Sequence, residues 1–302
     1  MPYIEPPTRK ATARFGIPNA RLPPDLDPSS FLIYTPGLPE NPRPQETLDI
    51  QLHDIRHEMD EGPRGVYDQV HERGWAVARH ESRFVREIGS LEGAERYREE
   101  TCELMRSYLN CTKVYQWNST VRKSDQKQST IVDRQKGPEE GFLPTSIIQP
   151  PASHAHVDQD EIWAPNVVRM ATKQDPTTFK RSMIINIWRP LKGKSPPRPV
   201  TSSPLCMLHF PTLSPSDTAK QESQFGTGIQ IHYAPSQKWC YLRHMTPDEI
   251  VVLKCYDSLQ GSDGGALYAG HVAAEMDDSE GVEEGLVRPR ESIEVRMVAV
   301  WE

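Results

Sequence analysis

The chain has no long apolar run, and none of its hydrophobic stretches approaches the 18 or more residues that a membrane-spanning helix needs. Its first residues, Met-Pro-Tyr-Ile-Glu-Pro-Pro, also lack the apolar segment of a secretory signal peptide. Basic residues are outnumbered, since 35 Lys and Arg stand against 42 Asp and Glu. A basic surface for nucleic acid or anionic lipid is therefore not expected, and we predict neither a nucleic-acid nor a membrane partner.

Cysteine is scarce. The chain contains five, an odd number, and no two of them have Cys-x-x-Cys spacing. This pattern argues against a disulfide framework and against a zinc ribbon. Reduced thiols are typical of proteins that remain in a reducing compartment, so we predict a cytoplasmic location.

Proline is abundant. Eleven of the 28 prolines cluster between residues 23 and 44 and between residues 196 and 204. Proline resists helix interiors and central strands, so these stretches are expected to be extended segments and loops. We predict an extended N-terminal arm over residues 1–48 and a single domain over residues 49–302, a size that β-barrel folds reach as one domain.

Periodicity predicts helices early in the chain and strands late. A short helix is expected near 64–73, and the clearest helix spans about 92–109, where apolar residues recur at spacings of three and four. Strands are predicted at 49–57, 74–79, 113–122, 182–188, 228–233, 239–243, 250–255 and 292–301. The segments at 228–233 and 239–243 are expected to pair as a hairpin. The fold class is therefore α+β, mainly β, with an antiparallel barrel or double sheet as its body.

The segment His156-Val157-Asp158 places an imidazole and a carboxylate two residues apart. On a strand these side chains project from the same face, so both can bind one metal ion. Two histidines and one carboxylate on one face of an octahedron suit non-haem Fe(II), because three positions stay open for a co-substrate and dioxygen. A double-stranded β-helix supplies the third ligand from a strand near the end of the chain. His271, which follows a glycine-rich loop, is the expected residue.

An arginine and a serine follow His271 at a spacing that fits a dicarboxylate. Arg290 and Ser292 lie two residues apart on the last predicted strand, hence on one face. A guanidinium group can hold a carboxylate through two charge-assisted hydrogen bonds, and the hydroxyl can add a third. The other end of 2-oxoglutarate would then chelate the iron. Arg296 lies on the same face and competes for this role, and the arginine that does not bind 2-oxoglutarate is expected to pair with an acid such as Glu294.

Five blocks together resemble a known fungal and bacterial family of oxygenases. They are Ala155-His-Val-Asp-Gln159, Ile185-Asn-Ile-Trp-Arg-Pro-Leu191, Arg243-His-Met-Thr-Pro-Asp-Glu249, Leu253-Lys-Cys-Tyr-Asp-Ser258 and Pro289-Arg-Glu-Ser-Ile-Glu-Val-Arg296. The family includes cephalosporin 7α-hydroxylase subunits, gibberellin desaturase-like proteins and meroterpenoid endoperoxide-forming oxygenases. The resemblance covers roughly residues 49–302.

The resemblance implies a double-stranded β-helix, of the jelly-roll or cupin-like kind, and an Fe(II)/2-oxoglutarate-dependent dioxygenase that oxidises small specialised metabolites with O2. It implies His156, Asp158 and His271 as the iron ligands and catalytic residues, and Arg290 and Ser292 as the 2-oxoglutarate site. One departure concerns the last ligand. Family members often have Pro-His-Thr-Ala-Phe there, whereas this chain has Ala269-Gly-His271-Val-Ala-Ala.

Further residues are candidates for contact with the small molecules. Lys254 and Tyr241 could contact the co-substrate, although a strand-edge lysine and a packed tyrosine are the alternatives. The candidates for the substrate pocket are Trp117, Arg122, Asn186, Trp188 and His154. Aromatic residues and long loops favour a roomy apolar pocket, hence a terpenoid, polyketide or alkaloid substrate. A homodimer or a heterodimer is compatible with the resemblance.

Two other functions compete with this interpretation. Residues His154, His156 and Glu161 match part of a four-ligand cupin motif, which would favour a non-redox metal isomerase or cyclase, but Ile148 and Val168 stand where that motif has glycine. The chain could also be a catalytically silent partner subunit of a heterodimeric oxygenase. The complete ligand set argues against that, because a silent subunit has no need of it.

Overall fold

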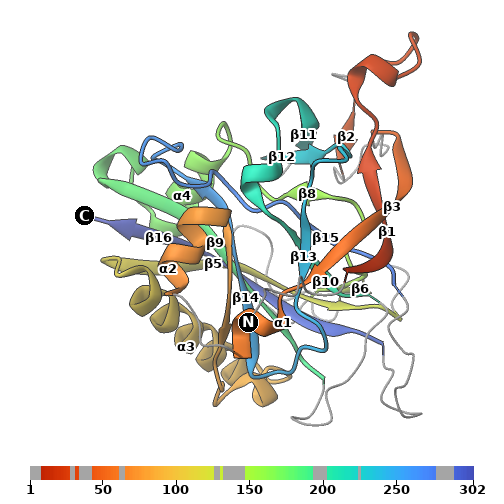
Figure 1. Cartoon of the computed structure of the whole chain (residues 1–302). Coiled ribbons are helices and arrows are strands. Elements are labelled where there is room, and N and C mark those ends of the chain that lie inside the picture. Colours follow the sequence, from red (N-terminus) through yellow and green to blue (C-terminus); the bar gives the residue numbers. More distant parts are fainter. Residues whose placement is uncertain are drawn as a thin grey trace, which may run out of the picture.

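The computed structural model describes residues 8–27, 31–33, 43–60, 65–125, 130–131, 147–192, 203–223, 226–276 and 289–302. Within these ranges the strands form two sheets (Figure 1). The larger sheet has nine strands, in the spatial order β1 (Thr8–Gly16), β3 (Gln45–Asp54), β13 (Trp239–Tyr241), β10 (Leu205–Leu208), β15 (His271–Ala273), β8 (His156–Val157), β12 (Gly226–Ile231), β11 (Thr218–Ser223) and β2 (Leu32–Ile33).

The smaller sheet has seven described strands, in the order β4 (Trp75–Arg79), β14 (Glu249–Asp257), β9 (Arg181–Pro190), β16 (Glu291–Trp301), β5 (Lys113–Lys123), β7 (Ile147–Gln149) and β6 (Thr130–Ile131). Four α-helices are described: α1 (Arg56–Asp60), α2 (Val66–Arg73), α3 (Leu91–Leu109) and α4 (Ala164–Thr172). From β13 to β16, successive strands alternate between the two sheets, with β13 and β15 in the larger sheet and β14 and β16 in the smaller, which is the connectivity expected of a double-stranded β-helix.

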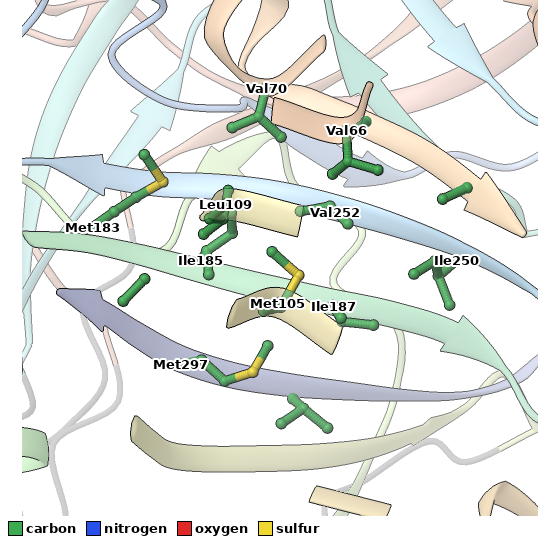
Figure 2. Packing of buried hydrophobic residues seen from close by; sticks show 14 of the residues in the cluster. Val66, Val70, Met105, Leu109, Met183, Ile185, Ile187, Ile250, Val252 and Met297 are labelled. Atoms are coloured by element: carbon green, nitrogen blue, oxygen red, sulfur yellow. The ribbon is translucent and has the colours of Figure 1, made fainter. Parts of the chain in front are cut away.

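Helices α2 and α3 cover the outer face of the seven-stranded sheet. Successive side chains of a strand point to opposite faces, so Met183, Ile185 and Ile187 of β9 all face these helices (Figure 2). Met105 and Leu109 of α3 pack against them with at most 1% of their surface exposed. The alternate residues of β9, which include Asn186 and Trp188, therefore face the space between the two sheets, where the candidate site lies.

The long helix α3 confirms the prediction for 92–109. Ser90 caps its first turn by accepting a hydrogen bond from the Gly93 N–H at 3.0 Å. Its buried stripe includes Tyr97, Thr101 and Met105. The helix ends at Asn110, which adopts a left-handed conformation with φ of 48°.

Strand β1 closes the nine-stranded sheet. It pairs antiparallel with β3 along its full length, and its other edge reaches the segments beside β8 and β15. Arg14 N–H donates to Ser153 O at 3.2 Å, Ala155 N–H donates to Arg14 O at 2.8 Å, and Thr12 exchanges two backbone bonds with Glu275. The sheet thus encloses a second apolar cluster, to which β1 contributes Ala11, Ala13 and Phe15.

This closure corrects the expected domain organisation. The boundary placed between residues 48 and 49 falls inside β3, and β1 of the expected arm is a strand of the larger sheet rather than a separate extension. The proline content of residues 23–44 predicts extended segments, whereas residues 8–16 before them alternate between exposed and buried positions and form a strand.

Two other expectations were wrong. Strands β12 and β13 do not form a hairpin, since β12 lies between β8 and β11 while β13 lies between β3 and β10. The predicted strand at 49–57 ends at Asp54 and gives way to α1. Helix α4 was not predicted at all, although Pro165 stands in its first turn, where proline is well tolerated. Residues 123–142 are rich in Lys, Gln, Asp and Glu, a composition that predicts a loop, and most of them lie outside the described residues.

The helices of the described part of the chain include none that is long and apolar enough to cross a bilayer. All five cysteines are unpaired, as expected, and four of them are buried.

Removal of the Phe15 side chain should destabilise the whole fold. Phe15 is fully buried and lies edge-on to Tyr233 and Trp239, with ring centroids 5.4 and 5.7 Å away. We expect Phe15→Ala to lower the free energy of unfolding in urea by about 3–5 kcal/mol. The control is Leu91→Ala, at a side chain that is 60% exposed, and it should change that energy by less than about 0.5 kcal/mol. A small effect of Phe15→Ala would mean that β1 is a dispensable arm after all.

Candidate metal centre

Three side chains from the nine-stranded sheet converge on one point. Strands β8 and β15 are antiparallel neighbours, and His271 stands directly opposite His156. Asp158 follows β8 by one residue. One ligand atom of each residue lies within 4.8 Å of the others, and the two imidazole centroids are 4.4 Å apart. The structure thus brings together the three residues that the sequence predicted as a metal site.

Backbone carbonyls orient both imidazoles. The Nδ1 of His156 donates to the carbonyl of His154 at 2.8 Å, and the Nδ1 of His271 donates to the carbonyl of Ala269 at 3.1 Å. Each Nδ1 therefore carries the proton, and each Nε2 keeps a lone pair for a metal ion. The Nε2 of His156 lies 3.4 Å from Oδ1 of Asp158. This donor set fits Fe(II).

The sequence around His271 departs from the family pattern, but the backbone there still holds the imidazole in place. A Cβ at Gly270 would come within 2.4 Å of Cδ1 of Ile231, so the end of that side chain would have to move to admit a larger residue. Ala269 is fully buried, and its N–H donates to the carbonyl of Lys254 at 2.6 Å. This bond ties the residues before β15 to β14 of the opposite sheet, so the departure from the family pattern leaves the imidazole fixed.

Asp158 is held from the opposite sheet. Its Oδ2 accepts hydrogen bonds from Asn186 Nδ2 at 2.7 Å and from Arg296 Nε at 3.0 Å. The same two residues also contact Glu294, Asn186 at 2.6 Å and Arg296 at 3.3 Å. Burial opposes ionisation of Asp158, but the guanidinium of Arg296 and the nearby histidines hold its pKa well below the usual range. The carboxylate is therefore charged and ready to bind a cation.

These contacts distinguish Arg290 from Arg296, the two arginines that the sequence offers as candidates to bind the dicarboxylate. Arg296 pairs with Glu294, which was expected of whichever arginine does not bind 2-oxoglutarate, and also with Asp158. Asn186 binds the same two carboxylates, so the structure places it behind the metal ligand rather than in the substrate pocket. The even separation of Arg290 and Arg296 predicts that both lie on one face of β16. It does not predict which of the two lies beside Asp158.

A small cavity lies beside the three ligands, between the two sheets. Its lining residues are Arg122, Ala152, His156, Trp188, Leu205, Leu253, His271, Ala273, Arg290 and Glu294. Apolar walls with a few charged groups are typical of pockets that bind small molecules. Of the predicted substrate residues, Arg122 and Trp188 lie in this lining.

Arg290 and Ser292 present unused polar atoms near this cavity. Arg290 is 5% exposed, donates to the carbonyl of Ser203 at 3.0 Å, and lies over the Trp188 ring at 5.5 Å. Among the described residues, its Nε and the hydroxyl of Ser292 are buried without a hydrogen-bond partner. Burial, and repulsion from the nearby Arg122, lower the pKa of Arg290 to about 9. An anion bound here would accept hydrogen bonds from the Nε of Arg290 and the hydroxyl of Ser292, and it would stabilise the charged form of Arg290.

Lys254 and Tyr241 were wrong candidates for co-substrate contact. Leu253 lines the cavity, so the next residue of β14 points to the other face; Lys254 there donates to Ala266 O at 2.6 Å and pairs with Asp257 at 3.3 Å. Tyr241 pairs in register with Cys206, and both pack in the cluster enclosed by the nine-stranded sheet, on the face away from the ligands.

His154 and Trp117 lie outside the cavity lining. The His154 ring centroid is 4.8 Å from that of His156, but His154 does not belong to the ligand group. Burial, together with the neighbouring His156, lowers the pKa of His154 to about 3, so this imidazole is neutral at neutral pH. Trp117 packs with the cluster beneath α4, beside Tyr115 and Trp163.

Comparisons with known proteins assign the chain to a family. The family described as an oxidoreductase/YMDC permease-like domain matches residues 23–300, and the chain belongs to it. Two similar proteins are a hydroxylase/desaturase efuI of Hormonema carpetanum, 29% identical over 69% of this chain and 70% of that protein, and a hydroxylase/desaturase CTB9 of Cercospora beticola, 26% identical over 67% and 62%. A third, the Fe(II)/2-oxoglutarate-dependent dioxygenase nvfI of Aspergillus novofumigatus, is 26% identical over 37% of this chain and 41% of that protein.

A solved structure of the iron and alpha-ketoglutarate-dependent endoperoxidase NvfI has the same fold. It superposes with a TM-score of 0.71 over 99% of both chains, at 18% identity. The likeness confirms the predicted double-stranded β-helix, which is mainly β.

Loss of a ligand should abolish metal binding without unfolding the protein. We expect His156→Ala and Asp158→Ala to bind less than a tenth of the Fe(II) that the parent binds under anaerobic conditions, because two ligands rarely hold this ion. Circular dichroism should show both variants folded. His154→Ala is the matched control from the same segment, and it should keep its metal. Unfolding of both ligand variants would instead show that the pair is structural.

Arg296 should matter for stability more than any surface arginine. Arg296→Met leaves Asp158 and Glu294 buried without their cation, which should cost about 3–5 kcal/mol in the free energy of unfolding of the metal-free protein. Urea denaturation measures this, with Arg83→Met, at a side chain that is 79% exposed, as the control. If both variants lose the same small amount, the buried network is not what holds Asp158.

Proposed function

We propose that this chain is an Fe(II)/2-oxoglutarate-dependent dioxygenase that oxidises a small specialised metabolite in natural-product biosynthesis. The observation that carries the proposal is the meeting of two imidazoles and a carboxylate, within 4.8 Å, beside a cavity lined by a buried arginine. Similarity to hydroxylase/desaturase proteins and to an Fe(II)/2-oxoglutarate-dependent dioxygenase supports the same function.

His156, Asp158 and His271 would hold the iron. Bound together, Fe(II) and 2-oxoglutarate supply an oxidative decarboxylation that uses O2 to oxidise a C–H bond of the substrate. The chain's own part is to fix the ligands. The carbonyls of His154 and Ala269 set the imidazole tautomers, and the network around Arg296 keeps Asp158 ionised and in place.

Arg290 and Ser292 would hold the distal carboxylate of 2-oxoglutarate. The guanidinium lies over Trp188, so its plane is fixed before the co-substrate arrives, and its unused Nε is available to donate. The serine hydroxyl can supply a further hydrogen bond. Leu205, Leu253 and Trp188 line the cavity and exclude water around these charges, which strengthens each interaction.

We propose a terpenoid, polyketide or alkaloid substrate that is hydroxylated, desaturated or rearranged, in a protein that works in the cytoplasm. A homodimer or heterodimer would be compatible with this activity. A silent partner subunit is the alternative, and the retained ligand set and the cation beside it speak against it. A non-redox isomerase or cyclase would not need Arg290.

Succinate formation is the decisive test. Purified protein with Fe(II), ascorbate, O2 and 2-oxoglutarate should form succinate slowly alone, and faster with candidate metabolites. His156→Ala serves as the negative control. If metal-loaded protein neither binds nor decarboxylates 2-oxoglutarate, the enzyme proposal fails. Conversion of a metabolite without 2-oxoglutarate or O2 would point to the isomerase or cyclase instead.

Arg290 should govern affinity for the co-substrate. Arg290→Gln removes a charge-assisted contact, so the Kd of 2-oxoglutarate, titrated calorimetrically into anaerobic Fe(II)-loaded protein, should rise about 10- to 100-fold. Tyr241→Phe, at a tyrosine on the far face of the sheet, should leave that Kd unchanged. Equal affinities in Arg290→Gln and the parent protein would move the carboxylate site elsewhere.

A further inference from the structure

The cavity beside the metal ligands contains one more arginine than the co-substrate needs. Arg122 and Arg290 both line it, and they come from neighbouring strands, Arg122 from β5 and Arg290 from the residue before β16. We infer that Arg122 binds an anionic group of the organic substrate, so the substrate is an acid, such as a carboxylic acid, rather than a neutral metabolite. The inference rests on the function proposed above.

Arg122 is held in place but not neutralised. It stands opposite Ser292 in the β5–β16 register, and its Nη1 donates to the carbonyl of Pro150 at 2.9 Å. Within the described ranges, none of the ion pairs closer than 4.0 Å involves Arg122 or Arg290. Arginine does not shed its proton in proteins, so its charge has to be met by an anion.

The two carboxylates of this region are already engaged. Asp158 and Glu294 both accept hydrogen bonds from Asn186 and Arg296, and Asp158 would also bind the metal. Glu294 lines the same cavity, and the charges of Glu294 and Asp158 act on Arg122 from a distance. No described ion pair closer than 4.0 Å joins either acid to Arg122, so the described acids do not pair with this guanidinium.

Binding of Fe(II) and 2-oxoglutarate does not neutralise the charge of Arg122 either. Fe(II) brings two positive charges and 2-oxoglutarate two negative ones, so the pair adds no net charge. Its distal carboxylate would meet Arg290 and Ser292, and Arg122 would still face the cavity unpaired. A buried unpaired cation is costly, and a substrate anion is the group that removes this cost when the substrate binds.

The competing assignment is that both arginines hold the same 2-oxoglutarate carboxylate. The affinity for 2-oxoglutarate in anaerobic Fe(II)-loaded protein distinguishes the two. We expect Arg290→Gln to weaken it about tenfold or more, whereas Arg122→Gln should match the surface control Arg83→Gln. If Arg122→Gln weakens 2-oxoglutarate as strongly as Arg290→Gln does, Arg122 belongs to the co-substrate site and the inference is overturned.

A pair of isosteric probes tests the anion directly. Benzoate and its neutral amide, benzamide, are titrated at constant ionic strength into protein saturated with Fe(II) and 2-oxoglutarate, and binding is followed by tryptophan fluorescence. We expect benzoate to bind about tenfold more tightly than benzamide. Arg122→Gln should abolish the preference, Arg122→Lys should restore part of it, and Arg83→Gln should keep all of it.

The outcomes separate the inference from the function on which it rests. Equal binding of benzoate and benzamide by parent protein that holds 2-oxoglutarate overturns the inference alone. A benzoate preference that survives in Arg122→Gln also overturns it, because another group then binds the anion. Parent protein that binds neither Fe(II) nor 2-oxoglutarate overturns the proposed function and the inference together.

Discussion

The structure depends on one buried ion pair, between Arg296 and Asp158. Asp158 belongs to the nine-stranded sheet and Arg296 to the seven-stranded sheet, and their 3.0 Å contact joins the two across the core. Asn186 and Glu294 extend the network, because Asn186 Nδ2 donates to both carboxylates and Arg296 also contacts Glu294. Buried charges of this kind are costly unless they are paired. Here the network fixes the one ligand whose flexible side chain could otherwise turn away from a metal.

The candidate metal ligands could be proposed from the sequence because local spacing brings them together. His156 and Asp158 lie two residues apart, and a late histidine after a glycine-rich loop completes the set. Arg290 and Ser292 followed from the same rule of alternation. The roles of Arg296 and Asn186 could not be read this way, because depth along a strand depends on how the two sheets are stacked, and this is a property of the whole fold.

Other errors came from pairings between residues far apart in the sequence. Lys254 points away from the cavity because its neighbour Leu253 points into it, and the pairing of β14 with β9 decides which of the two faces inward. The hairpin of β12 and β13 failed because each strand found partners from elsewhere in the chain. Strand β1 was overlooked because its partners are β3 and segments beside β8 and β15. In each case the short-range pattern was real, but competition among strands decided the outcome.

The long separation in sequence between Asp158 and Arg296 has a consequence for the order in which the chain folds. The two residues are 138 positions apart, and β16 is synthesised long after the His-x-Asp segment. Until β16 pairs with β9 and β5, the seven-stranded sheet lacks its central strand and Asp158 lacks its cation. Asp158 therefore reaches its final position only after β16 has been incorporated, and the candidate metal site is completed late in folding.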